Sequence, residues 1–130
     1  MPSERVLDRL EHLVENADRI AEYLDGMTAE GYVADRMTID ACERCLERVI
    51  EATVKIGAER MAEILPSQSP AQIRSMGNFL RHDYDVVDAN TVYITLTQRV
   101  PELRAAAAAE IVRIEREAAP GDHESDGETE

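Results

Sequence analysis

The sequence contains no tryptophan and only one phenylalanine, and aromatic residues make up 4% of the chain. This scarcity argues against a β-sandwich or barrel, because such cores favour aromatic and β-branched residues. The two cysteines, Cys42 and Cys45, are too few for a disulfide framework. They have zinc-like spacing but lack a second pair of ligands, with His12 the one further candidate nearby, so we expect two buried core thiols.

Long apolar runs are also missing, and none of those present approaches the length that a membrane-spanning helix requires. The N-terminal segment is polar and does not resemble a signal peptide. We therefore expect a cytoplasmic protein that does not enter membranes. Positive charge is scarce as well: the net charge of −13 excludes a general nucleic-acid coat protein. Segment 71–104 is the exception, because its four arginines balance its four acidic residues.

Leucine, isoleucine, valine, alanine and methionine dominate the apolar residues, and they recur with helical spacing. The pattern predicts a helix from a Ser3 cap to about Leu24, a short turn or helix around Ala29–Asp35, and a long helix over Thr38–Leu65. A third helix is expected to open at Ser69-Pro70, and a fourth to run from an Asp88 cap through Ala89 to about Glu117. Pro101 should kink or split this last helix, because proline lacks the N–H that a helix interior needs.

These helices predict an all-α protein, an up-and-down bundle of four to five helices. At 130 residues the chain is long enough for one domain. We assign residues 1–118 to the helical domain. Residues 119–130 are rich in Gly, Asp, Glu, Ser and Thr, and they predict a disordered acidic tail.

The third predicted helix carries the residues best suited to chemistry. Arg74, Asn78 and His82 are spaced by four, and Arg81 falls seven residues after Arg74, so all of them share one helix face. Guanidiniums can hold phosphate oxygens, and an imidazole can move a proton near neutral pH. RNA supplies its own nucleophile, the 2′-hydroxyl, so such a site needs no metal or cofactor. The alternative is structural: a histidine at a helix end often serves only as a C-terminal cap.

The stretch Gly77-Asn-Phe-Leu-Arg-His-Asp-Tyr84, followed by Val86-Val-Asp88, resembles the Arg-Asn-x-Leu-x-His-x-Tyr…Val-Asp signature of HepT-like proteins of the HEPN superfamily. The resemblance covers roughly residues 5–115. It implies a helical homodimer that acts as a ribonuclease toxin, with His82 as the catalytic histidine. It also implies a partner, a minimal nucleotidyltransferase antitoxin that silences the toxin by adding AMP to the motif tyrosine, here Tyr84.

The sequence departs from the family signature at Gly77, where the motif usually has arginine. Arg74, one helical turn earlier, and Arg81, beside the histidine, are the two candidates for the missing guanidinium. The departure leaves two hypotheses. One is an endoribonuclease that uses His82, Arg81, Arg74 and Asn78. The other is an inactive dimer that binds a nucleotide or scaffolds its nucleotidyltransferase.

Overall fold

The computed structural model of the protein describes residues 2–78 and 88–119, and all the regular secondary structure there is helical, as the sequence predicts. Met1, the acidic tail from residue 120 and segment 79–87 lie outside the described residues. The elements are α1 (Pro2–Leu24), α2 (Ala29–Val33), α3 (Arg36–Ile56), α4 (Ala58–Ile64), α5 (Pro70–Ser75), α7 (Ala89–Ile94), the π-helical segment η1 (Thr95–Arg99) and α8 (Val100–Ala118).

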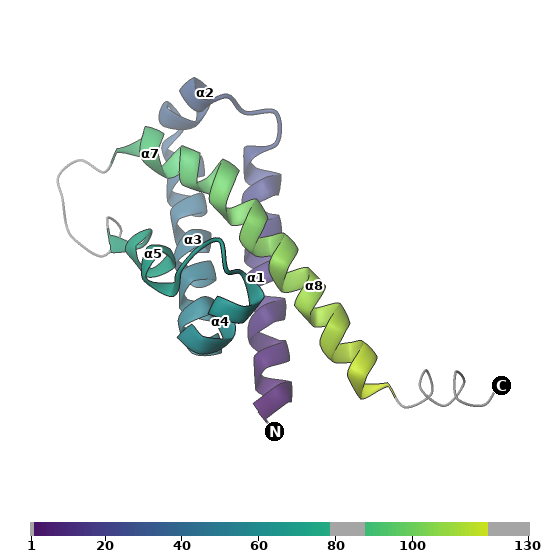
Figure 1. Ribbon diagram of the computed structural model, residues 1–130. Helices are drawn as coiled ribbons and strands as arrows, with labels where there is room; N and C mark the ends of the chain where they lie inside the picture. Colours follow the sequence, from purple (N-terminus) through teal and green to yellow (C-terminus); the bar gives the residue numbers. More distant parts are fainter. Residues whose placement is uncertain (1, 79–87, 120–130) are drawn as a thin grey trace.

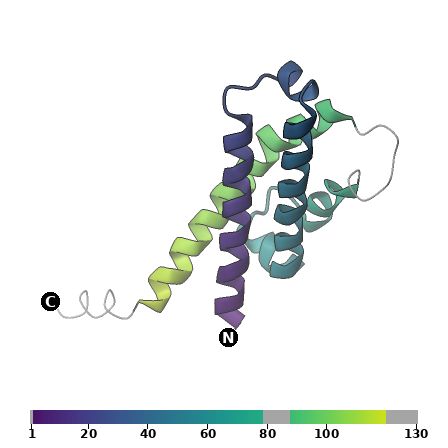
Figure 2. The ribbon, with the colours of Figure 1, turned by 180° about the vertical axis from the view of Figure 1, so that it is seen from behind.

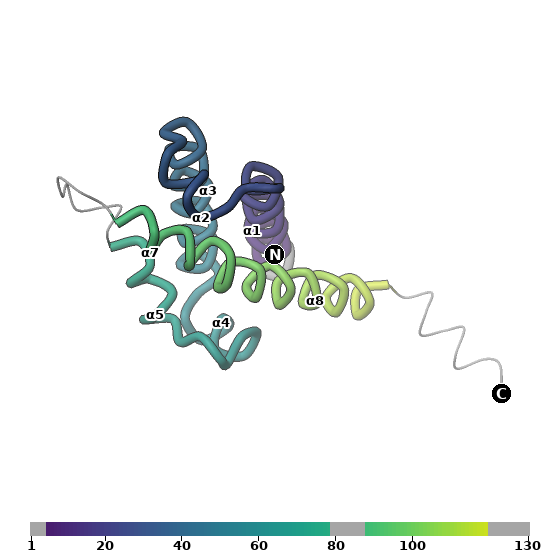
Figure 3. The backbone as a smooth tube through the Cα atoms, turned by 90° about the horizontal axis from the view of Figure 1, so that it is seen from above, coloured from purple at the N-terminus to yellow at the C-terminus, as the bar shows by residue number. Residues whose placement is uncertain are grey.

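The helices form two layers. α1 and α3 are long, antiparallel neighbours joined at one end through α2 (Figure 1). α8 crosses α1 on one side of this pair, and α4 and α5 lie beside α3 (Figure 3). Seen from behind, α1 and α3 stand in front of the other helices (Figure 2). One face of the α1–α3 pair is therefore not covered by any other described element.

The core lies between these layers and follows the predicted helical stripes. On α1 the predicted apolar residues Leu10, Leu13, Ala17 and Ile20 are all buried. α3 contributes a wider apolar side, which includes both cysteines, Cys42 and Cys45. These thiols are free and buried, as predicted, and burial raises the pKa of Cys42 to about 12.

The predicted long helix over Thr38–Leu65 is wrong as a continuous element. It divides at Gly57, which ends α3 and precedes α4 with φ +105° and ψ +147°. Only glycine adopts this conformation readily, because at a positive φ a Cβ atom crowds the residue's own adjacent peptide groups. The break turns α4 away from the axis of α3, toward α5 and α8. The expected Ser3 cap is also corrected, because α1 already includes Pro2 and Ser3.

The last predicted helix is not split near Pro101, because α7, η1 and α8 follow one another without a break; the departure from regular α-helix is the π-helical segment just before the proline. Asp88 caps α7 by accepting a hydrogen bond from the backbone N–H of Asn90 (3.1 Å). The helix then widens into η1 before α8 begins at Val100. Pro101 cannot donate a backbone hydrogen bond to the preceding turn, and a π-helical turn is one way to absorb that loss.

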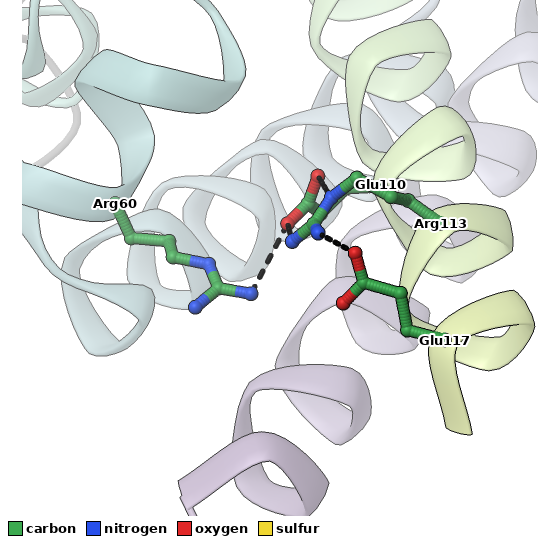
Figure 4. A network of polar contacts seen from close by, with 4 residues as sticks. All are labelled: Arg60, Glu110, Arg113 and Glu117. Atoms are coloured by element: carbon green, nitrogen blue, oxygen red, sulfur yellow. Dashed lines mark hydrogen bonds and ion pairs between the residues drawn. The ribbon is translucent and has the colours of Figure 1, made fainter.

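Polar contacts tie α4 to α8 (Figure 4). Glu110 of α8 accepts a hydrogen bond from Arg60 of α4 (3.1 Å) and two from Arg113 on its own helix (3.0 and 2.6 Å). Arg113 also reaches Glu117 at 2.8 Å. The Glu110 side chain is 12% exposed, so its charge is largely shielded from water and depends on these partners.

The described residues contain neither a membrane-spanning helix nor a cluster of metal-binding side chains. None of the helices in the ranges 2–78 and 88–119 is both long and apolar enough to cross a membrane. Within the same ranges, no group of three or more histidine, cysteine or acidic side chains is arranged to hold a metal ion.

Candidate functional site

The candidate site begins on α5, a short helix that the sequence specifies locally. Ser69 and Gln72 form a reciprocal cap at its start: the Ser69 hydroxyl accepts from the Gln72 N–H (3.1 Å), and the Gln72 side chain accepts from the Ser69 N–H (2.8 Å). Ile73 and Met76 are buried against the core, as predicted. Arg74 therefore lies on the exposed side of α5.

The helix does not continue unbroken toward the histidine. α5 ends at Ser75, and a turn follows in which Met76 N–H donates to Ile73 O (3.2 Å) and Gly77 N–H donates to Arg74 O (3.1 Å). These bonds span three residues instead of four, so the chain winds more tightly here than an α-helix does. Spacing by four therefore does not by itself place Arg74 and Asn78 on one continuous face.

The structure describes two of the five predicted site residues. Arg74 and Asn78 are both exposed, and each lies at an end of the turn that contains Gly77. Arg81, His82 and Tyr84 belong to segment 79–87 and lie outside the described residues. Asp88 marks the other end of that segment. Its pKa is held low chiefly by a hydrogen bond from the Thr91 hydroxyl, so it remains a charged cap for α7 near neutral pH.

Gly77 is buried, and it borders a cavity of about 440 Å³ between the motif segment and α3. From α3 the cavity is lined by the apolar Ile50 and Val54 and by charged side chains: Arg44, Glu47 and Glu51.

Arg44 is the functional candidate that the sequence did not reveal. Its guanidinium donates to Glu47 at 3.0 Å and is 63% exposed, so a phosphate can still approach it from solvent. Arg44, Glu47 and Glu51 recur three and four residues apart, which marks one face of α3. The spacing predicts that these three residues share one face of α3, but it does not predict what this face packs against. Only the tertiary structure shows that Arg44 and Gly77 line the same cavity.

An all-helical bundle and the motif from Asn78 to Tyr84 occur together in a known protein family. A family model described as Ribonuclease HepT-like matches residues 13–110, from α1 through most of α8. This family lies within the HEPN superfamily, which defines the class of protein. The chain belongs to the HepT-like ribonuclease family. No solved structure matches the chain.

Proposed function

We propose that the protein is an endoribonuclease toxin of a toxin–antitoxin pair that cleaves RNA without a metal ion. The observation that carries the proposal is the family match, which spans the motif and three quarters of the chain. The exposed Arg74 and Asn78 at the motif turn support it, because they place phosphate- and ribose-binding groups where a solvent-borne substrate reaches them.

The proposed reaction uses the substrate's own nucleophile. His82 takes the proton of the ribose 2′-hydroxyl or gives one to the leaving oxygen, and Asn78 orients the histidine or binds a phosphate oxygen. The 2′-oxygen bonds to phosphorus while the bond from phosphorus to the 5′-oxygen breaks. The products are a 2′,3′-cyclic phosphate and a 5′-hydroxyl. DNA lacks the 2′-hydroxyl and is not a substrate.

A guanidinium is needed to offset the charge that develops on the phosphate, and Gly77 does not provide it. Arg81 and Arg74 are the candidates from the motif segment itself. Arg44 is a third candidate, because it reaches the cavity that Gly77 borders from the opposite wall. We propose that one or more of these three take the place of the usual motif arginine.

The active form is proposed to be a homodimer in which two motif segments face each other across a composite cleft. Val54 supports a partner on this side, because it is 53% exposed at the edge of the Gly77 cavity. A two-fold axis would also double the local arginines in an otherwise acidic protein. Light scattering at micromolar concentration should give the mass of two chains.

Control of the activity is proposed to come from a minimal nucleotidyltransferase antitoxin that adds AMP to Tyr84. The added phosphate would place negative charge next to His82 and repel RNA. Incubation with the partner and ATP should add the mass of one AMP to the chain. The same adduct on a Tyr84→Phe variant would contradict this assignment.

A second function is favoured by one observation, the absence of an arginine side chain at Gly77. Under it the protein is an inactive HEPN dimer that binds a nucleotide or scaffolds its nucleotidyltransferase. An RNA cleavage assay separates the two functions. The partner-free wild-type protein in EDTA should cut single-stranded RNA and leave cyclic-phosphate ends.

The residue assignments are tested in the same assay. His82→Ala should lower the cleavage rate by about 100-fold or more, the usual scale for one general acid–base group. Alanine variants of Arg81, Arg74 and Arg44 identify the clamp, since loss of a single transition-state donor typically costs about 100-fold or more. Arg116→Ala, on the exposed end of α8, is the matched control. If the wild-type protein cuts no RNA, the enzyme proposal fails and the binding function replaces it.

A further inference from the structure

A second cavity, of about 300 Å³, opens on the uncovered face of the α1–α3 pair. Among the described residues, its walls come from α1 and α3, the two helices that stand in front of the others in Figure 2. The α1 residues Arg9, His12, Asn16 and Arg19 recur three and four positions apart, so they form one face. From Arg9 to Arg19 this face extends about 15 Å, at about 1.5 Å per residue.

The cavity is cationic in a protein that is strongly acidic. Four basic side chains line it against two acidic ones, although the whole chain has 14 basic and 27 acidic residues. Lys55 contacts Glu51 at 3.6 Å. No ion pair joins Arg9, Arg19 or Arg48 to any acidic group in the described ranges 2–78 and 88–119. Three guanidiniums on one face are therefore available to an anionic ligand.

Asn16 adds a second, independent feature. The residue is 4% exposed and lines the cavity. The Nδ2 group donates to the His12 carbonyl at 2.9 Å, which fixes the orientation of the amide. Its Oδ1 is buried and accepts no hydrogen bond from the described residues. Because buried acceptors are nearly always satisfied in folded proteins, this oxygen can accept from a water, or from a ligand group once the neighbouring side chains of the cavity shift.

These features define the chemistry of a ligand. It carries anionic groups for the arginines and a hydrogen-bond donor for Asn16. A ribonucleotide strand has both, since its phosphates accept from guanidiniums and its 2′-hydroxyls donate. Glu51 borders this cavity and also the Gly77 cavity, so the two adjoin across α3.

We propose that the α1–α3 face is an RNA-binding subsite, in which Arg9, Arg19 and Arg48 hold backbone phosphates and Asn16 accepts from a ribose hydroxyl. The subsite extends the proposed ribonuclease site and rests on that function for the identity of its ligand. A strand held at the motif turn continues over α3 onto this face. The subsite accounts for how so acidic a protein retains an RNA substrate, because the arginines concentrate positive charge along its path.

The test measures binding of a fluorescein-labelled single-stranded RNA by anisotropy, with His82→Ala as the parent so that the RNA stays intact. The parent is compared with an added Arg19→Gln/Arg48→Gln pair. The control pair is Arg36→Gln/Arg116→Gln, which removes the same charge from exposed helix positions outside both cavities. We expect affinity to fall at least tenfold for the first pair and less than twofold for the control.

Salt dependence gives a separate readout. Each phosphate contact on a single strand contributes a slope of about −0.7 to the plot of log affinity against log salt, so the test pair should flatten the slope by about 1.4. Equal affinities and equal slopes for the two pairs would refute the subsite. Light scattering is run on the same samples. If the test pair dissociates the protein into single chains and leaves RNA affinity unchanged, the face is a protein interface and the proposal is overturned.

The role of Asn16 is tested first by changing the RNA and not the protein, so that the fold is not disturbed. RNA with 2′-O-methyl groups cannot donate from that position, and it should bind the parent about fivefold more weakly than unmodified RNA. An added Asn16→Leu substitution should abolish this difference. A difference that persists in the Asn16→Leu variant would remove Asn16 from the subsite.

RNA cleavage by the wild-type protein, measured beside RNA binding by the variants, separates the failure of this proposal from the failure of the ribonuclease proposal. If the wild-type protein cuts RNA but the Arg19 and Arg48 substitutions leave binding unchanged, the subsite fails and the ribonuclease stands. If binding depends on Arg19 and Arg48 but no RNA is cut, the subsite stands and the ribonuclease proposal fails.

Discussion

Replacing Glu110 with glutamine removes the charge at the junction of α4 and α8 while keeping the size of the side chain. The wild-type carboxylate accepts from Arg60 across the junction and from Arg113 along its own helix (Figure 4). The contact with Arg60 is the tertiary one: it joins two residues that are 50 positions apart in sequence. The substitution tests how firmly this contact holds α4 in place.

The magnitude follows from exposure. Glu110 is 12% exposed but Arg60 is 34% exposed, so water screens part of the attraction. We expect a coupling energy of about 1 kcal/mol between Arg60 and Glu110, above the typical value for exposed pairs and below that for a fully buried charge. Including the lost acceptor for Arg113, Glu110→Gln should lower the free energy of unfolding by about 1.5 kcal/mol. The melting temperature should fall by about 5 °C.

A double-mutant cycle with Arg60→Gln and Glu110→Gln measures the coupling by urea unfolding. The matched control is a cycle on Arg36 and Asp40, an exposed pair on α3 whose side chains are 80% and 66% exposed. The control coupling should be at most about 0.5 kcal/mol. A coupling for Arg60 and Glu110 that does not exceed the control would refute this account of the junction.

The pH dependence of the same variant has a definite sign. Hydrogen bonds from Arg113, together with the charges of Arg113 and Arg60, lower the pKa of Glu110 in the folded protein. A carboxyl group with a lowered folded pKa stabilises the fold fully above its unfolded pKa of about 4.3, and loses that effect as the pH falls through the folded value. The stability difference between wild type and Glu110→Gln should therefore be constant from pH 6 to 8 and shrink below about pH 4. A difference that does not shrink would contradict the assignment.

Three further predictions concern the backbone, the thiols and a helix cap. In urea unfolding, Gly57→Ala should lower the free energy of unfolding by about 1–3 kcal/mol, and Gly26→Ala by a smaller amount of about 1–2 kcal/mol. An added Cβ meets nothing within 4 Å at either position, so only the backbone strain differs. The reverse order would contradict this reasoning. Cys42 and Cys45 should not react with a thiol reagent at pH 8 until the protein is unfolded, because burial raises both pKa values. At a pKa of about 12, the thiolate fraction of Cys42 is roughly 1000-fold below that of an exposed thiol. Rapid labelling of the native protein would refute this prediction. Asp88→Ala should lower the melting temperature at pH 7 and leave it unchanged well below pH 4. The pKa of Asp88 is lowered in the folded protein, so the charged carboxylate that caps α7 stabilises the fold at pH 7, and this stabilisation is lost as the pH falls. An equal loss at both pH values would count against the cap.

The sequence predicted the local features of the fold well. The stripe of Leu10, Leu13, Ala17 and Ile20 identified the buried side of α1. Ser69 and Asp88 marked the starts of α5 and α7. These features depend on residues within a few positions of one another, so the sequence contains all the information that they require.

The candidate site was predictable only in part. The motif from Gly77 to Tyr84 led to the family that the comparison confirms. Arg74 and Asn78 are exposed, but their roles stay predictions, as do those of His82, Arg81 and Tyr84. Arg44 was not found from the sequence, because a surface arginine paired with a glutamate is typical of any solvent-facing helix.

The sequence by itself thus determined the helical class, the buried stripes and the motif that identifies the family. Only the tertiary structure decided where the long helix breaks and which faces meet. Glycine inside a helical pattern costs only about 1 kcal/mol, so the apolar periodicity continued through Gly57. In the structure Gly57 has a positive φ that only glycine adopts readily, and α4 packs beyond it against α5 and α8. Arg44 borders the cavity at Gly77, and Arg19 and Arg48 line the cavity of the α1–α3 face. Both arrangements arise because segments distant in sequence pack side by side. Such contacts depend on the packing of the whole chain, which no local pattern specifies.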